Sequence, residues 1–351
     1  MWFRYTLSNA RAFLSVASAE TCKQCSSRGK IITPIQSVQR LFATNVQCPT
    51  VGEVIEQWSE RFKKESIPEP VESIEHIVAH ILGTKKVLNE LNVEFIHYVL
   101  LFFYFVLFFI NRLLRMPVQY IIGEWDFRDI TLKLVPPIFI PRPETEMLVH
   151  YVLKALNSSQ NKNHEILEVG CGSGPISLSI AHTNKTANCI AIDSNPDACE
   201  LTKENRDRLG LEKQVAIMHA TLQENGTIDL SNVLSGPKDL DLNSKTFDFI
   251  VSNPPYVSTK QIPTLTPEIK IFEDLPALDG GEDGLKIIKP LLKYSATALK
   301  PGGRLLLEVD PTHPEYIQFF TKKYSMFNLR YEHTYKDFCN NERFVEVSKI
   351  S

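Results

Sequence analysis

Four consecutive residues, Asn253, Pro254, Pro255 and Tyr256, form the most specific chemical pattern in the sequence. They follow an apolar run, residues 247–252, whose aromatic and β-branched residues predict a buried strand that ends at the prolines. Because proline fixes φ, the side-chain carbonyl of Asn253 and the backbone carbonyl of Pro254 can face one point. Two convergent acceptors suit an NH2 group on a planar system, although a plain strand followed by a Pro-Pro turn would also explain the tetrapeptide.

A second pattern lies upstream, where a predicted strand at 166–169 leads into a glycine turn, residues 170–174, and a helix opened by Pro175. Glycines in such a turn let the backbone approach a ligand at a helix N-terminus. The next strand ends at Asp193, which places a carboxylate where a ribose diol would lie. A dinucleotide fingerprint would have glycine at position 175, so proline there favours S-adenosylmethionine over a nicotinamide cofactor.

The elements that must position these residues alternate between strands and helices from residue 165 onward. This alternation predicts an α/β fold with the seven-stranded, Rossmann-like sheet of a class I S-adenosylmethionine-dependent methyltransferase. A polar stretch, residues 224–244, is interpreted as a loop, and Asp283 with Gly284 is expected to open a helix. Strands are expected at 166–169, 189–192, 215–219, 247–252, 304–308, 329–335 and 343–347, the last two antiparallel, and helices near 176–181, 197–209 and 314–324.

A small helical domain, residues 46–116, is predicted ahead of this sheet. Thr50 and Glu53 have the spacing of a capping box. The apolar residues within 51–62 and within 74–82 each fall on one helical face, which predicts two amphipathic helices.

A linker, residues 117–146, separates this domain from a catalytic domain at 147–351 that begins with a helix. Alternating residues over 117–127 and 131–135 predict a strand pair between the two lobes. Arg142 stands between two prolines that pin its guanidinium. An ion pair between the lobes and a contact with substrate are equally open roles for it.

The first 45 residues have the composition of a mitochondrial transit peptide. Residues 1–43 carry six Lys or Arg residues against the single acid Glu20, with many hydroxyl side chains. A basic, disordered tail is the alternative. Cleavage would leave 32 basic and 40 acidic residues, so the remaining chain would attract a basic partner protein and repel nucleic acid. The seven scattered cysteines suit a reducing compartment, and the predicted location is the mitochondrial matrix.

Residues 95–110 form an unbroken apolar run that contains many aromatic residues. A helix of this length spans about 24 Å, short of the roughly 30 Å hydrocarbon core, so a membrane segment is a poor explanation. Two short helices also offer little apolar surface to cover so many rings. We therefore expect either a gene-model artefact or a helix that stays partly exposed.

Six ordered motifs together resemble the HemK/PrmC family of protein-(glutamine-N5) methyltransferases. Residues 307–314 are similar to the mitochondrial branch of that family. The family has an amphipathic helix with polar and basic residues where this chain has the apolar run. The resemblance implies that the substrate is the glutamine of the Gly-Gly-Gln loop of a mitochondrial peptide-chain release factor. The motifs are residues 117–123, 140–146, 168–174, 252–256, 277–284 and 341–344.

The resemblance also implies roles for the site residues. The turn cradles the methionine end of S-adenosylmethionine, Asp193 holds the ribose, and Leu222 lies at the adenine beside Thr221, where the family commonly has an acid. The tetrapeptide at 253–256 binds the glutamine amide, with Tyr256 stacking on the amide or forming the pocket wall. The turn residues are Gly170, Cys171, Gly172, Ser173 and Gly174.

Other activities stay open on the residues alone. Asn253 and its neighbours would equally serve the exocyclic amine of adenine, so a nucleic-acid N6-adenine methyltransferase is the main alternative, followed by a protein-lysine methyltransferase. No basic groove or recognition domain is visible, so no direct nucleic-acid partner is expected. A noncatalytic binding protein would not need the intact turn, Asp193 and Asn253. No metal ion is expected, because acceptors that position the amide suffice.

Overall fold

The computed structural model describes residues 50–84, 107–158, 163–237 and 239–350. The chain divides into two compact units, residues 1–118 and 119–351. The predicted transit peptide, 1–45, and residues 95–106 of the apolar run lie outside the described residues. Among the residues described, no helix is both long and apolar enough to cross a bilayer.

The first unit contains the two predicted amphipathic helices, α3 (Val51–Lys64) and α4 (Pro70–Leu82). The predicted capping box is confirmed: Glu53 N–H donates to Thr50 Oγ1 at 3.2 Å, and Thr50 N–H donates to Glu53 Oε2 at 2.7 Å. Reciprocal bonds of this kind satisfy donors that the first helical turn leaves free.

The described end of the apolar run, residues 107–110, belongs to a helix that extends to residue 113. Phe109 is fully buried, and its ring stacks on Trp58 at 4.6 Å between centroids and meets Phe62 edge-on at 5.9 Å. Buried aromatic pairs of this geometry contribute beyond the area that they bury. Phe109 therefore belongs to the core of the first unit, while Leu107, Phe108 and Ile110 are half-buried.

The strand pair expected in the linker is only partly correct. β1 (Glu124–Phe127) and β2 (Ile130–Lys133) form an antiparallel hairpin, but residues before them form α6 (Val118–Ile122). Pro117 precedes the first helical residue and Gly123, at φ +82°, ends the helix, which is the usual placement of both residue types. The apolar residues at 118–122 therefore lie on a helix and not on the predicted strand.

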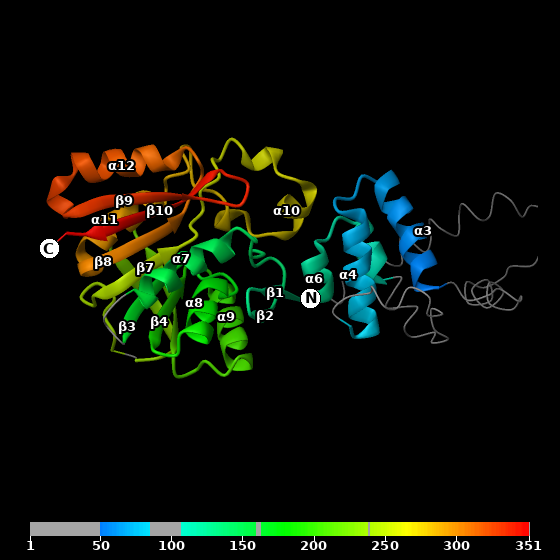
Figure 1. Ribbon diagram of the computed structural model, residues 1–351, viewed down its shortest axis with the longest axis horizontal. Helices are drawn as coiled ribbons and strands as arrows, with labels where there is room; N and C mark the ends of the chain where they lie inside the picture. Colours follow the sequence, from blue (N-terminus) through cyan, green and yellow to red (C-terminus); the bar gives the residue numbers. More distant parts are fainter. Residues whose placement is uncertain (1–49, 85–106, 159–162, 238, 351) are drawn as a thin grey trace, which may run out of the picture. The chain divides into compact units, whose positions relative to one another are not determined.

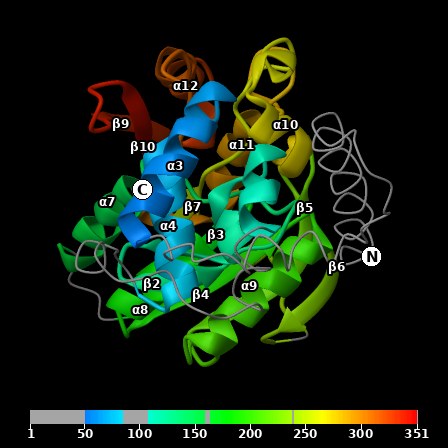
Figure 2. The same cartoon turned by 90° about the vertical axis from the view of Figure 1, so that its right-hand side faces the viewer.

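The second unit is built on one eight-stranded sheet in the order β6-β5-β4-β3-β7-β8-β10-β9, whose strands are labelled between Figures 1 and 2. The pairs among β5, β4, β3, β7 and β8 are parallel, and β6, β10 and β9 are joined by antiparallel pairs. The strands are β3 (His164–Val169), β4 (Ala187–Asp193), β5 (Val215–Leu222), β6 (Ile228–Ser235), β7 (Phe247–Ser252), β8 (Leu299–Glu308), β9 (Leu329–Lys336) and β10 (Glu342–Lys349).

The strand order reverses between β3 and β7, which lie side by side at the centre of the sheet in Figure 2. In open α/β sheets, ligands bind at the carboxyl ends of the strands at this point. Helices α8 and α9 cover one face, and α12 lies toward the other (Figures 1 and 2). The helices are α7 (Thr145–Asn157), α8 (Pro175–Thr183), α9 (Pro196–Arg208), α10 (Pro267–Phe272), α11 (Ile288–Ala298) and α12 (His313–Lys323).

Two expectations about this unit were wrong. The sheet has an eighth strand, β6, within the stretch interpreted as a polar loop; of its residues only Ile228 is buried, so pairing with β5 defines it rather than an apolar pattern. Helix α11 begins at Ile288, not at Asp283. The Asp283 carboxylate accepts the Leu285 N–H at 3.0 Å, and Gly284 has φ +71°, so these residues form a turn before the helix.

Candidate active site

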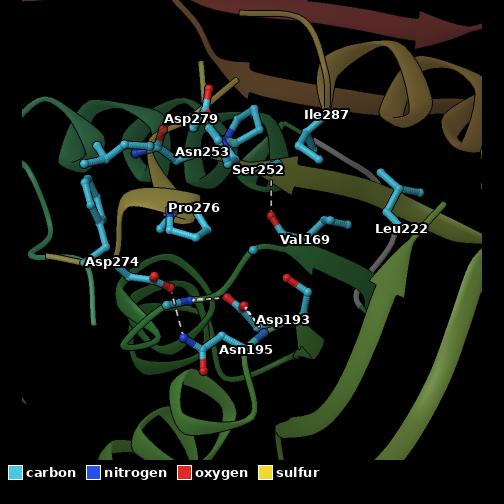
Figure 3. A pocket seen from close by; sticks show the side chains of 18 of the residues that line it. Val169, Asp193, Asn195, Leu222, Ser252, Asn253, Asp274, Pro276, Asp279 and Ile287 are labelled. Atoms are coloured by element: carbon cyan, nitrogen blue, oxygen red, sulfur yellow. Dashed lines mark hydrogen bonds between the residues drawn. The ribbon is translucent and has the colours of Figure 1, made fainter. Parts of the chain in front are cut away.

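A cavity of about 380 Å³ opens at the carboxyl ends of β3, β4, β5 and β7 (Figure 3). Its volume lies in the range of small-molecule and cofactor sites. Because these strands flank the reversal of strand order, the fold itself brings their terminal residues to one place. The cavity wall is completed by the segments 274–279 and 286–287 and by Phe139.

The predicted glycine turn lies at the wall of this cavity. Gly170 and Gly172 line it with φ of +79° and +57°, and a Cβ on either would project into open space. Cys171 and Ser173 instead bury their side chains. A Cβ on Gly174, at φ +89°, would approach a leucine of α8 to 2.7 Å. Gly170 and Gly172 therefore present backbone to the cavity. Cys171, Ser173 and Gly174 pack inward and fix the conformation of the turn.

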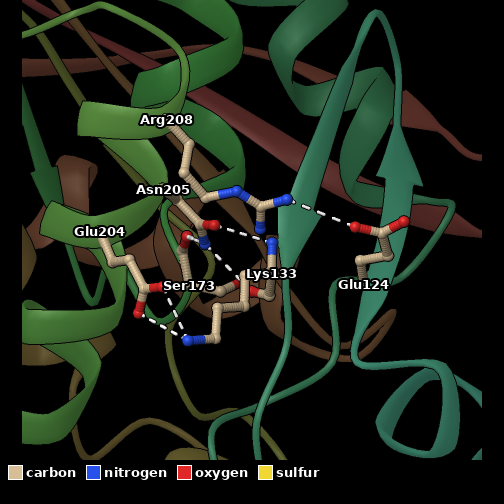
Figure 4. A network of polar contacts seen from close by, with 6 residues as sticks. All are labelled: Glu124, Lys133, Ser173, Glu204, Asn205 and Arg208. Atoms are coloured by element: carbon tan, nitrogen blue, oxygen red, sulfur yellow. Dashed lines mark hydrogen bonds and ion pairs between the residues drawn. The ribbon is translucent and has the colours of Figure 1, made fainter.

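Asn205 of α9 holds the turn from behind, a role that no sequence pattern indicated. Its fully buried side-chain amide accepts the Lys133 N–H at 2.7 Å and donates to the carbonyls of Lys133 at 3.1 Å and Ser173 at 2.9 Å. Exposed ion pairs, Lys133 with Glu204 and Arg208 with Glu124, flank this contact (Figure 4). The β1–β2 hairpin is thereby joined to the glycine turn.

Asp193, at the end of β4, lies in the cavity as predicted. Its Oδ2 accepts the N–H of Gly172 and its Oδ1 accepts that of Asn195, both at 2.9 Å (Figure 3). Burial raises the pKa of Asp193, and these backbone hydrogen bonds oppose the shift. Asn195 Nδ2 also donates to Asp274 Oδ2 at 3.1 Å, which brings a second carboxyl group to the cavity. Asn195 could have been recognised as a helix cap before Pro196, whereas Asp274 carried no local signal.

The remaining wall of the cavity is mostly apolar. Leu222 and Thr221, at the end of β5, line it, and Ile287 and Pro276 contribute from elsewhere in the chain. A planar base can bury its faces against such side chains. The open glycine positions, the Asp193 carboxyl and this apolar wall fit the methionine, ribose and adenine parts of S-adenosylmethionine.

All four residues of the tetrapeptide line the same cavity. Asn253 Nδ2 donates to Thr145 Oγ1 at 3.1 Å, so the carbonyl of its side chain is the end left to accept another donor. Tyr256 donates its hydroxyl to Glu308 Oε1 at 3.2 Å, and burial raises the pKa of the Tyr256 phenol. Neither Thr145 nor Glu308 was singled out from the sequence, although both fall in motifs that carried the family resemblance.

Arg142 is not among the residues that line the cavity. Its Nη2 pairs with the buried Glu273 carboxylate at 2.8 Å, and its guanidinium lies 4.7 Å from the centre of the Phe139 ring. Both partners belong to the second unit, so the ion pair is not one between lobes. Phe139 does line the cavity, and Arg142 therefore supports the wall from outside.

Known proteins that resemble this chain are methyltransferases. Residues 145–273 match the model of the Methyltransferase small domain. The chain is 38% identical over 313 residues to the MTRF1L release factor glutamine methyltransferase of Homo sapiens, with 85% of this chain and 87% of the relative covered. It is 33% identical over 235 residues to the release factor glutamine methyltransferase of Caulobacter vibrioides, with 67% and 74% covered.

The sheet, the cavity at its switch point and the matched domain define a class I S-adenosylmethionine-dependent methyltransferase. The predicted fold class and cofactor are confirmed. The chain belongs to the release factor glutamine methyltransferase family. It is therefore an S-adenosylmethionine-dependent protein-glutamine methyltransferase.

Proposed function

We propose that this enzyme methylates the side-chain N5 of the glutamine in the Gly-Gly-Gln loop of a mitochondrial peptide-chain release factor. The observation that carries the proposal is the bond from Asn253 Nδ2 to Thr145, because it leaves the Asn253 carbonyl for a substrate NH2. The names of the relatives from human and Caulobacter support a release factor as substrate. The basic, hydroxyl-rich residues 1–45 support import into the mitochondrial matrix.

The difficulty of the reaction lies in the substrate. The lone pair of an amide nitrogen is delocalised into its carbonyl, so the nitrogen is a poor nucleophile. In the proposed mechanism the Asn253 side-chain carbonyl and the Pro254 backbone carbonyl each accept one N–H of the glutamine. These two bonds orient the nitrogen toward the sulfonium methyl group that S-adenosylmethionine supplies, and they stabilise the positive charge that the nitrogen gains.

The other site residues bind and position. Gly170 and Gly172 give the methionine end close access to backbone, and Asp193 accepts hydrogen bonds from the ribose hydroxyls. Leu222 packs on the adenine, and Tyr256 packs against the glutamine amide with Pro255. Arg142 stabilises the wall at Phe139 rather than contacting the glutamine directly.

The test is methyl transfer from labelled S-adenosylmethionine to three acceptors in parallel. We expect incorporation into a mitochondrial release factor, and none into its Gln→Ala loop variant or into DNA. Label on DNA would support the adenine alternative, since the tetrapeptide suits an exocyclic amine as well. Label on the Gln→Ala variant would point to another acceptor, such as lysine, and mass spectrometry of the modified peptide would identify it.

A further inference from the structure

A buried carboxyl group, Glu308, lies behind the tetrapeptide and has no part in the mechanism described so far. It ends β8 and is 1% exposed. Its Oε2 accepts the hydroxyl of Thr145 at 2.7 Å, and its Oε1 accepts the hydroxyl of Tyr256 at 3.2 Å. One carboxyl group therefore holds Tyr256 directly and reaches Asn253 through Thr145.

The direction of these hydrogen bonds follows from the donors available. An ionised carboxylate can only accept, so the single hydroxyl proton of Thr145 must point to Glu308. The Thr145 oxygen is then left as an acceptor, and only the NH2 end of Asn253 can face it, at 3.1 Å. The opposite orientation of the Asn253 amide would place two oxygens against each other with no proton between them.

We propose that Glu308 is a positioning residue that sets the orientation of the Asn253 amide through Thr145. The carbonyl end of Asn253 is thereby presented to the substrate NH2, while the same carboxylate fixes the Tyr256 ring. This inference rests on the proposed function, in which Asn253 accepts a glutamine N–H. Glu308 itself touches neither substrate nor cofactor.

The burial of Glu308 and the charged groups around it make the orientation of the Asn253 amide depend on pH. Burial raises the pKa of Glu308 to about 7, and the negative charge of Glu144, just before α7, raises it further. The hydrogen bonds that Glu308 accepts and the Arg343 guanidinium on β10 lower this pKa. Arg343 lies 5.9 Å from the centre of the Tyr256 ring and is anchored by Asp337 at 3.5 Å. Once protonated, Glu308 can donate to Thr145, which can then donate to Asn253 and reverse the amide.

The first test separates the hydroxyl of Thr145 from its shape. Thr145→Val should lower kcat about tenfold, with the dissociation constant of S-adenosylmethionine unchanged, because the variant loses one orienting hydrogen bond. Thr145→Ser, which keeps the hydroxyl, should restore most of the turnover. Equal kcat in Thr145→Val and the parent enzyme would overturn the inference.

The second test uses the pH profile. In the parent enzyme kcat should fall as pH drops through about 7, because the carboxylate form is the active one. Glu308→Gln should lose this inflection, whereas the matched control Glu346→Gln should keep it. Glu346 is also buried in the sheet and bonded to a tyrosine and an arginine, but it lies on β10 away from the tetrapeptide. An inflection retained in Glu308→Gln would contradict the proposal.

A third measurement does not depend on activity. With 15N-labelled asparagine, the side-chain signal of Asn253, assigned by its loss in Asn253→Ala, should shift between pH 6 and 8 in the cofactor-free enzyme. An Asn253 signal that does not shift with pH would refute the positioning role of Glu308 even if the release factor is methylated. A signal that moves, in an enzyme that fails to methylate the release factor, would keep this role and remove the proposed substrate.

Discussion

Asn253 is the residue on which the proposed chemistry depends most. Asn253→Ala removes the side-chain acceptor for the substrate NH2 and should lower kcat about 10²-fold, with a much smaller change in S-adenosylmethionine affinity. Single-turnover rates and calorimetric titration of the cofactor measure the two effects. Asn232→Ala, at an exposed position on β6, is the control and should change neither. Unchanged turnover in Asn253→Ala would refute the assigned role.

Glu168 provides a prediction about stability. Glu168 lies near the carboxyl end of β3 and is fully buried, and its Oε2 accepts the Ser177 N–H at 2.9 Å. Burial raises the pKa of Glu168 from 4.5 to about 8. The folded protein therefore keeps this proton at neutral pH while the unfolded chain has lost it. The contribution of protonated Glu168 to folding stability is present in full below about pH 4.5 and is lost as pH rises to about 8.

Glu168→Gln removes this titration. Relative to the parent protein, the variant should gain thermal stability progressively from pH 5 to pH 8, because only the parent loses the Glu168 contribution over that range. Unfolding scans of both proteins at pH 5, 6.5 and 8 give the difference, in which the other titrating groups cancel. A difference that stays constant with pH would contradict the raised pKa.

Between elements, the contact of α9 with the β1–β2 hairpin supports the glycine turn. Asn205→Ala would leave the Lys133 N–H and two carbonyls without their partner, at a cost of roughly 2–4 kcal/mol of folding free energy. We also expect weaker binding of S-adenosylmethionine, because Ser173 belongs to the turn. Lys133→Ala removes only the exposed ion pair with Glu204 and should cost about 0.5 kcal/mol. Denaturant titration gives the free energy of unfolding of both variants. Equal losses of this free energy would argue against the buried Asn205 amide as the contact that joins α9 to the hairpin.

The segment before α11 packs its backbone directly behind the tetrapeptide. A Cβ on Gly284, at φ +71°, would lie 2.4 Å from the Tyr256 carbonyl oxygen, so Gly284→Ala must displace the loop. We expect a loss of at least tenfold in kcat/KM. Gly302→Ala has a similar φ of +77° with open space around the Cβ, and it controls for backbone strain alone. Comparable activity of the two variants would exclude the predicted clash.

For the whole molecule, the testable feature is the N-terminal segment, residues 1–45. A fluorescent reporter fused to residues 1–45 should enter mitochondria, because the segment is basic, hydroxyl-rich and nearly free of acids. Replacing its Lys and Arg residues with Gln is the matched control and should abolish import. Fluorescence microscopy reads the outcome, and a diffuse signal from the native segment would contradict a transit peptide.

Features that depend on neighbouring residues could be predicted from the sequence. The capping box of Thr50 and Glu53, the glycine turn before Pro175, Asp193 at a strand end and the tetrapeptide after β7 were all predicted in place. Each rests on propensities and spacings within a few residues, which act whatever the rest of the chain does. Local reading failed at α6, where four apolar residues around Gln119 fit two periods, and at β6, of whose residues only Ile228 is buried.

Contacts between side chains that are distant in the sequence arise only when the chain folds. Asn253 and Thr145 are 108 residues apart, and Thr145 and Glu308 are 163 apart, yet the three form one hydrogen-bonded chain. No local pattern encodes such a contact, because it arises when the sheet brings the end of β8 and the start of α7 together behind β7. The raised pKa of Glu308 follows from burial, which is a property of the packed molecule and not of the residue.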